Sequence, residues 1–165
     1  MNIDSLMTFI ERTGEQVVAL DTFVEDQRAV AGAVRARNWP ALERALERAA
    51  AAAERVSSTE KTRAEAWIAF LYDIGLPDES TVFRASLALP LEFRSTLNDA
   101  YRSLRLSAMR ARIENDALSG FVGSAAETLR EAMEALFPER KCRTYGKTGR
   151  TRHAETGAMI LDTAL

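Results

Sequence analysis

The chain has 165 residues, with only 8 glycines and 4 prolines, and a formal net charge of -2. This length allows one domain with or without an appendage, and the balanced charge argues against a protein that binds nucleic acid with its whole surface. The single cysteine, Cys142, excludes an internal disulfide, and no secretory signal or apolar run near the ~20 residues of a membrane span is visible. We therefore expect a cytoplasmic protein without membrane insertion.

Two long helices are predicted in the first half of the chain. Apolar residues recur there at alternating spacings of four and three residues, which places them on one seam of a helix that packs along a partner helix. The first helix should begin near Asp4 or Ser5 and run to about Arg37. The residues Asn-Trp-Pro at 38–40 then form a corner, because Asn caps helices and Pro is tolerated in the first turn. The second helix should end at Gly75, with Pro77 preventing its continuation.

Residues 76–90 interrupt the long helices, and a short helix at about 80–89 is predicted within them. The third long helix is predicted to be continuous, since proline is absent from Phe93 to Phe137 and nothing there forces a break. Its predicted seam is Leu97, Tyr101, Leu104, Ala108, Ala111, Asn115, Leu118, Val122, Ala125, Leu129, Ala132 and Leu136.

The predicted fold is all-α: an elongated, antiparallel, up-down-up three-helix coiled-coil bundle with a short extra helix. We predict a helical domain over 1–137 and a flexible docking tail over 138–165. Residues 139–153 hold six Lys or Arg against one Glu and few apolar groups, which is typical of a mobile segment. The last residues turn apolar again.

Two features of the third helix suggest recognition. Asn115 is the one polar residue of the seam, and it is either tolerated at a wet position or sets the helix register through a hydrogen bond. A second apolar line lies on the opposite side of the helix. It consists of Leu106, Met109, Ile113, Ala117 and Gly120. A helix with two apolar faces either lies at the centre of a bundle or reserves one face for a partner.

The residues carry little sign of catalysis. His153 is the only histidine, so several imidazoles cannot share one metal within the chain. Gly146-Lys147-Thr148 resembles the end of a phosphate-binding loop, but Lys141 stands where its first glycine belongs. We therefore expect no enzymatic activity, no metal and no cofactor. The apolar faces instead suit the capture of an amphipathic helix from another protein.

The chain resembles the FlgN family of flagellar export chaperones. The resemblance covers nearly the whole length: an Arg-Asn-Trp-Pro-Ala-Leu-Glu corner after the first helix, a second helix ended by Gly, a long third helix containing an Asn, and a tail with a Tyr-x-x-x-Gly element at 145–149. It implies a cytoplasmic chaperone that binds the amphipathic C-terminal helix of hook-filament junction proteins, prevents premature polymerisation and delivers them to the flagellar type III export gate.

The resemblance also implies site residues. Tyr145 would contact the cytoplasmic domain of the export gate. The elements implied for client binding are the end of the third helix and the apolar tip of the tail: Leu118, Phe121, Val122, Leu129, Met133, Ile160, Leu161 and Leu165.

Two other classes of protein stay open. A structural coiled-coil adaptor without a secretion role would have the same seams, and it would self-associate through its helices without binding junction proteins. A helical-bundle enzyme is the other, although no catalytic constellation supports it. An exposed seam also allows a homo-oligomer.

Overall fold

The computed structural model describes residues 3–137, 144–145 and 151–152. Four helices account for nearly all of them: α1 (Ile3–Arg35), α2 (Trp39–Asp73), α3 (Val82–Ala88) and α4 (Leu91–Leu136). The predicted all-α class and the short extra helix are confirmed. A pair of two-residue antiparallel strands, β1 (Thr144–Tyr145) and β2 (Thr151–Arg152), was not predicted.

The chain divides into two compact units, Met1–Phe121 and Val122–Leu165, and the division falls inside α4. The proposed boundary between a helical domain and a docking tail after residue 137 follows the end of α4, and it stays a prediction. Most of the predicted tail lies outside the described residues.

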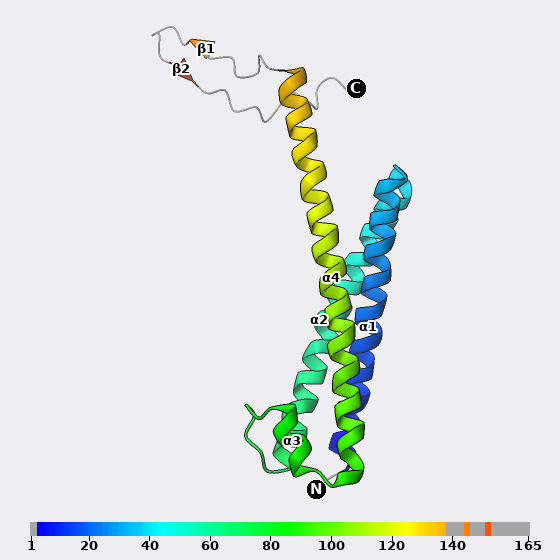
Figure 1. The fold of residues 1–165 in the computed structure, drawn as a ribbon, viewed down its shortest axis with the longest axis vertical. Helices are drawn as coiled ribbons and strands as arrows, with labels where there is room; N and C mark the ends of the chain where they lie inside the picture. The colour runs from blue at the N-terminus through cyan, green and yellow to red at the C-terminus, as the bar shows by residue number, and fades with distance from the viewer. Residues whose placement is uncertain (1–2, 138–143, 146–150, 153–165) are drawn as a thin grey trace. The chain divides into compact units, whose positions relative to one another are not determined.

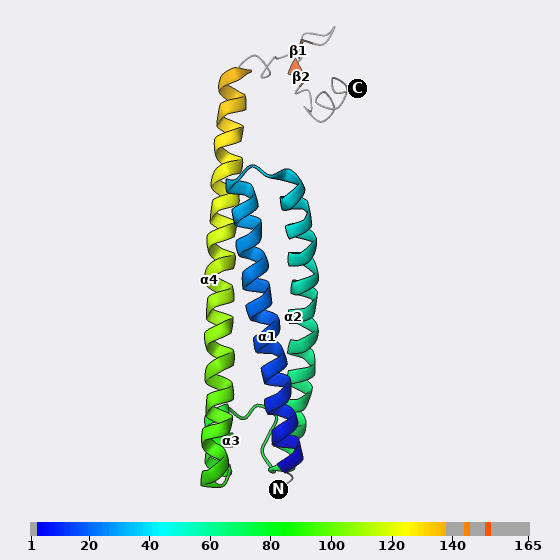
Figure 2. The ribbon, with the colours of Figure 1, turned by 90° about the vertical axis from the view of Figure 1, so that its right-hand side faces the viewer.

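The first unit has the predicted up-down-up order (Figures 1 and 2). α1 and α2 run in opposite directions, and the part of α4 in this unit runs in the direction of α1. Figure 2 shows α1 between α2 and α4. α1 contacts both neighbours through side chains, since Gln16 bonds to Arg63 of α2 and Gln27 bonds to Asn115 of α4.

The corner between α1 and α2 is formed by the residues that predicted it. The Asn38 side chain accepts a hydrogen bond from the Ala41 backbone N–H over 3.1 Å and caps α2, with Pro40 in the first turn. α1 ends at Arg35, slightly before the predicted end, because Arg37 adopts a left-handed conformation with φ 52°. The N–H of Asn38 then donates to the carbonyl oxygen of Ala33 over 3.0 Å, a pattern that closes helix C-termini.

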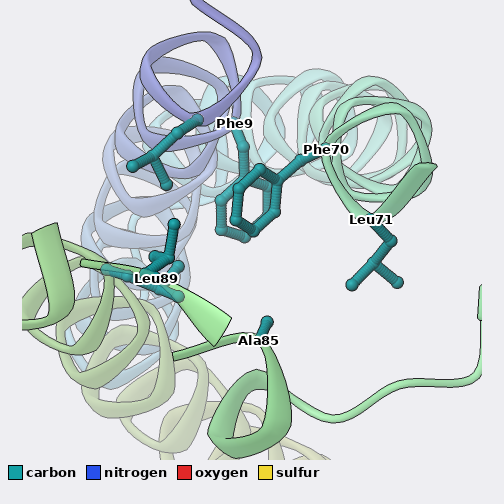
Figure 3. Close-up of a cluster of buried hydrophobic side chains, with 7 residues drawn as sticks. Phe9, Phe70, Leu71, Ala85 and Leu89 are labelled. Atoms are coloured by element: carbon teal, nitrogen blue, oxygen red, sulfur yellow. The ribbon is translucent and has the colours of Figure 1, made fainter. Parts of the chain in front are cut away.

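A hydrophobic cluster joins all four helices at one end of the first unit (Figure 3). The Phe9 ring lies 4.9 Å from the Trp67 ring and 6.2 Å from the Phe70 ring, measured between centroids. The buried members are Leu6, Phe9, Phe70, Leu71, Ala85, Leu89 and Leu97. α3 enters this cluster through Ala85, with Thr81 capping its start. The cluster therefore holds α3 and Leu89 against α1, α2 and the first turns of α4.

The predicted seam of α4 is right at every second position from Leu97 to Leu118, and its later positions are exposed. Leu97 and Ala111 are buried and Leu104 and Leu118 are half-buried, as predicted. The positions between them are corrected by one residue: the helix buries Ala100, Ser107 and Glu114 more deeply than Tyr101, Ala108 and Asn115. The side that α4 turns inward therefore carries the small residues Ala100 and Ser107, and the larger Tyr101 is exposed.

Candidate functional site

A polar contact joins α1 to α4 within the first unit. Gln27, only 4% exposed, donates from Nε2 to Oδ1 of Asn115 over 2.9 Å. The residue after Gln27 bonds to the residue before Asn115: Arg28 Nε donates to Glu114 Oε1 over 2.8 Å. Asn115 thus makes the interhelical hydrogen bond that one interpretation of the sequence required. Its role in setting the register stays a prediction.

Gln27 was not recognised from the sequence as the partner of Asn115. The sequence does contain a signal for this pairing: Gln27 interrupts the apolar seam of the first helix, just as Asn115 interrupts the seam of the third. A similar pair occurs between α1 and α2, where Arg63 Nε donates to Gln16 Oε1. Two polar residues at seam positions of neighbouring helices indicate a hydrogen bond, but the sequence does not say which residues face each other.

The part of α4 in the second unit carries an exposed apolar face. Val122, Leu129 and Leu136 follow one another at intervals of seven residues and are 52%, 63% and 74% exposed. Met133, one turn after Leu129, is also exposed. On a helix this spacing places them on one side, with alanines at 125, 126 and 132 between them. The result is a broad apolar face on which large side chains alternate with alanines.

The positions flanking this face carry no charge. On one edge of the face they are Ala126 and Met133 themselves, and on the other edge they are Thr128 and Ala135. Arg130 lies on the other side of the helix, where its Nη1 donates to Glu134 over 3.0 Å and its Nη2 donates to Glu127. The hydrogen bond from Glu127 and the charge of Glu134 raise the pKa of Arg130 above its ordinary value. Arg130 therefore stays cationic, and its charge is paired with two carboxylates of the same helix.

The remaining predicted site residues fall in different places. Leu118 is half-buried and Phe121 is 41% exposed, and both belong to the first unit. Tyr145 lies in β1, where its backbone pairs with Thr151. The predicted client-binding residues Ile160, Leu161 and Leu165 lie outside the described residues, as do Cys142 and His153.

The described residues contain no group of three or more His, Cys, Asp or Glu side chains placed to hold a metal ion. Among the described helices, none has the length and apolar character needed to cross a membrane.

Comparison with known proteins identifies a matching family. A family model, described as FlgN protein, matches residues 1–153. No curated protein and no solved structure gives a significant match to the chain. The family is one of chaperones and is not known for enzymatic activity. Since the match covers almost the entire chain and agrees with the corner, the long last helix and the helical fold described above, the protein belongs to the FlgN family of flagellar export chaperones.

Proposed function

We propose that the protein binds the amphipathic C-terminal helix of hook-filament junction proteins in the cytoplasm and prevents their premature polymerisation. The observation that carries the proposal is the exposed apolar face of α4 from Val122 to Leu136, in a chain of the FlgN family. Exposed apolar faces of this kind are the usual receptors for amphipathic helices.

The composition of the face indicates what the client helix presents. Val122, Leu129 and Leu136 rise above the alanines between them, so a client with large apolar side chains at helical spacing can place them over the alanines. Fully burying one Leu-sized side chain is worth about 1.5–3 kcal/mol. The uncharged flanks make this recognition depend on shape and apolar area more than on the charges of the client.

Delivery is assigned to the C-terminal part of the chain. We propose that Tyr145 contacts the cytoplasmic domain of the flagellar export gate, and that Ile160, Leu161 and Leu165 help to hold the client. Both roles follow from the family, and they assign the two ends of the tail to different partners. Binding of the client and delivery to the gate should then be separable by substitution.

The test of client binding is a titration of the full chain with a synthetic C-terminal helix of a junction protein. Leu129→Asp places a charge in the centre of the face and should weaken binding by at least about tenfold. Leu91→Asp is the matched control, because Leu91 is also exposed and lies on the first turn of α4.

Two results would count against the proposal. One is equal binding by the two variants and the unchanged chain. The other is self-association of the chain through Val122 and Leu129 with no affinity for the junction-protein helix, which would favour the coiled-coil adaptor.

A further inference from the structure

A second apolar stripe lies on the outer side of α4 within the first unit. Leu106, Met109 and Ile113 are 49%, 51% and 63% exposed. They are spaced three and four residues apart, which is the spacing of a coiled-coil seam. The side chains that α4 turns toward its neighbours, Ser107 and Ala111, are buried instead. The outer stripe is therefore a seam without a partner helix among the described residues.

Arginines flank this seam. Arg105 precedes Leu106, Arg110 follows Met109 and Arg112 precedes Ile113. These are the flanking positions of a coiled coil, where charges decide which helix can pair. No acidic residue occurs between Ala100 and Ile113.

The three arginines differ in how far they are engaged. The Arg105 side chain makes no hydrogen bond or ion pair within the described part of the chain. Arg110 lies 4.0 Å from Asp21 of α1, and Arg112 lies 3.8 Å from Asp116 one turn further along α4. All the groups in these two pairs are well exposed, so the pairs hold the arginines weakly.

The charge pattern argues against a second copy of the chain as the partner. In a parallel pair of helices, a residue that precedes a seam residue, such as Arg105, faces a residue that follows a seam residue on the other helix, such as Arg110. In an antiparallel pair, like positions face each other. In a parallel pair Arg105 of one copy would therefore face Arg110 of the other, and in an antiparallel pair Arg105 and Arg112 would lie at like positions, so pairing of two copies brings arginines together.

We propose that the face formed by Leu106, Met109 and Ile113, with its flanking arginines, binds an acidic amphipathic helix of another protein. The partner helix presents apolar residues along its seam and Asp or Glu at its flanking positions. Charge complementarity selects this partner, since each carboxylate meets an arginine that has no strong partner of its own.

This surface differs from the proposed client face in both place and chemistry. It belongs to the first unit, whereas the face from Val122 to Leu136 belongs to the second. Its flanks are cationic, whereas the flanks of the client face are uncharged. One helix therefore offers two surfaces that different helices can use, so the acidic partner need not displace the client.

The test uses two synthetic peptides of about three heptads with the same leucine seam, one with Glu and one with Lys at its flanking positions. Binding to the full chain is measured by fluorescence anisotropy at about 0.05 M and about 0.3 M salt. The acidic peptide should bind at least about tenfold tighter than the basic one, and added salt should reduce the difference.

Charge reversal locates the binding surface. In the double variant Arg105→Glu with Arg112→Glu, the acidic peptide should lose at least about tenfold in affinity and the basic peptide should gain affinity. The matched control is Arg55→Glu with Arg84→Glu, which makes the same charge change at exposed arginines of α2 and α3 and should leave both peptides unaffected. The basic residues between 139 and 153 are present in every variant, so they cannot cause a difference between them.

A second variant tests the seam itself. Met109→Asn removes an exposed apolar side chain without altering any arginine, and it should weaken the acidic peptide several-fold. Equal binding of the two peptides, or no effect of reversing Arg105 and Arg112, would overturn the proposal. So would a dimer of the full chain that Met109→Asn dissociates, or binding to vesicles with anionic lipids in the absence of any preference for the acidic peptide.

Discussion

Gln27 of α1 donates a hydrogen bond from Nε2 to Oδ1 of Asn115 on α4, over 2.9 Å. The second polar atom of the Gln27 amide, Oε1, is buried and has no hydrogen-bond partner among the residues that the structure describes. The pair therefore satisfies the donor but leaves an acceptor buried at the same point. We expect such a contact to contribute more to choosing one arrangement of the two helices than to the free energy of unfolding.

The first prediction concerns this pair. Asn115→Ala should lower the free energy of unfolding by about 1–3 kcal/mol, because it leaves the buried amide of Gln27 without a partner. Replacing both residues by Leu should restore most of that stability, since no buried polar group then remains. Urea unfolding measures both. Asp116→Ala, a change at the neighbouring exposed position, should change stability by less than about 0.5 kcal/mol.

The second prediction concerns the corner after α1. Arg37 has φ 52°, a conformation that costs a non-glycine residue about 1 kcal/mol. Arg37→Gly should therefore raise the midpoint of thermal unfolding by a few degrees. Arg35→Gly, within the last turn of α1, should lower it because glycine destabilises helices. If the two changes had effects of the same sign, the left-handed conformation at Arg37 would not be the cause.

The third prediction concerns the cluster that joins the four helices. Phe70 is fully buried and lies beside Phe9 and Trp67. Phe70→Ala should lower the free energy of unfolding by about 3–5 kcal/mol, because it leaves a cavity in the cluster. Phe83→Ala removes the same side chain at a position that is 72% exposed, and should have little effect. Denaturant titrations of the two variants compare these costs directly.

The fourth prediction separates client binding from delivery. Tyr145→Ala should leave the affinity for a junction-protein helix unchanged and weaken binding to the cytoplasmic domain of the export gate by at least about tenfold, the loss typical of an aromatic hot spot. Tyr72→Ala in α2 is the control, because Tyr72 is 82% exposed. A Tyr145 variant with normal gate binding, or with a changed helical spectrum, would refute the assigned role.

The periodicity of the sequence predicts the helices well because their ends carry specific residues. Asn38, Pro40, Gly75 and Thr81 all act at helix ends in the structure. These signals depend on the local sequence alone, so they can be recognised without knowledge of the rest of the fold.

The choice of buried side chains was harder to predict. In α1, Ile10 and Val17 fit the alternating spacing of four and three residues, yet the neighbouring Phe9 and Gln16 are more deeply buried. Adjacent residues such as Ala100 and Tyr101 both lie near a seam, and the position of the neighbouring helix decides which of them faces inward. A single sequence does not contain that position.

The candidate site was predicted in outline only. Val122, Leu129 and Met133 were implied by the resemblance to the FlgN family, and the structure shows that their side chains are exposed. The role proposed for the arginines beside Leu106 and Met109 could not be predicted from the sequence, since a helical surface commonly carries this many arginines. It emerges only once the structure places the stripe between them in solvent.

The central place of α1 has a consequence for the order in which the chain folds. α1 and α2 are joined by a short corner and can form a hairpin as soon as both have been synthesised. The contact between Gln27 and Asn115 closes a separation of 88 residues, so it carries a larger loop-closure cost and forms later. Until α4 emerges from the ribosome, Leu20 and Val24 on α1 lack the cover that Ala111 and Leu104 provide. The nascent hairpin therefore passes through a stage in which its own apolar stripe is a target for general chaperones, before the protein can act as one.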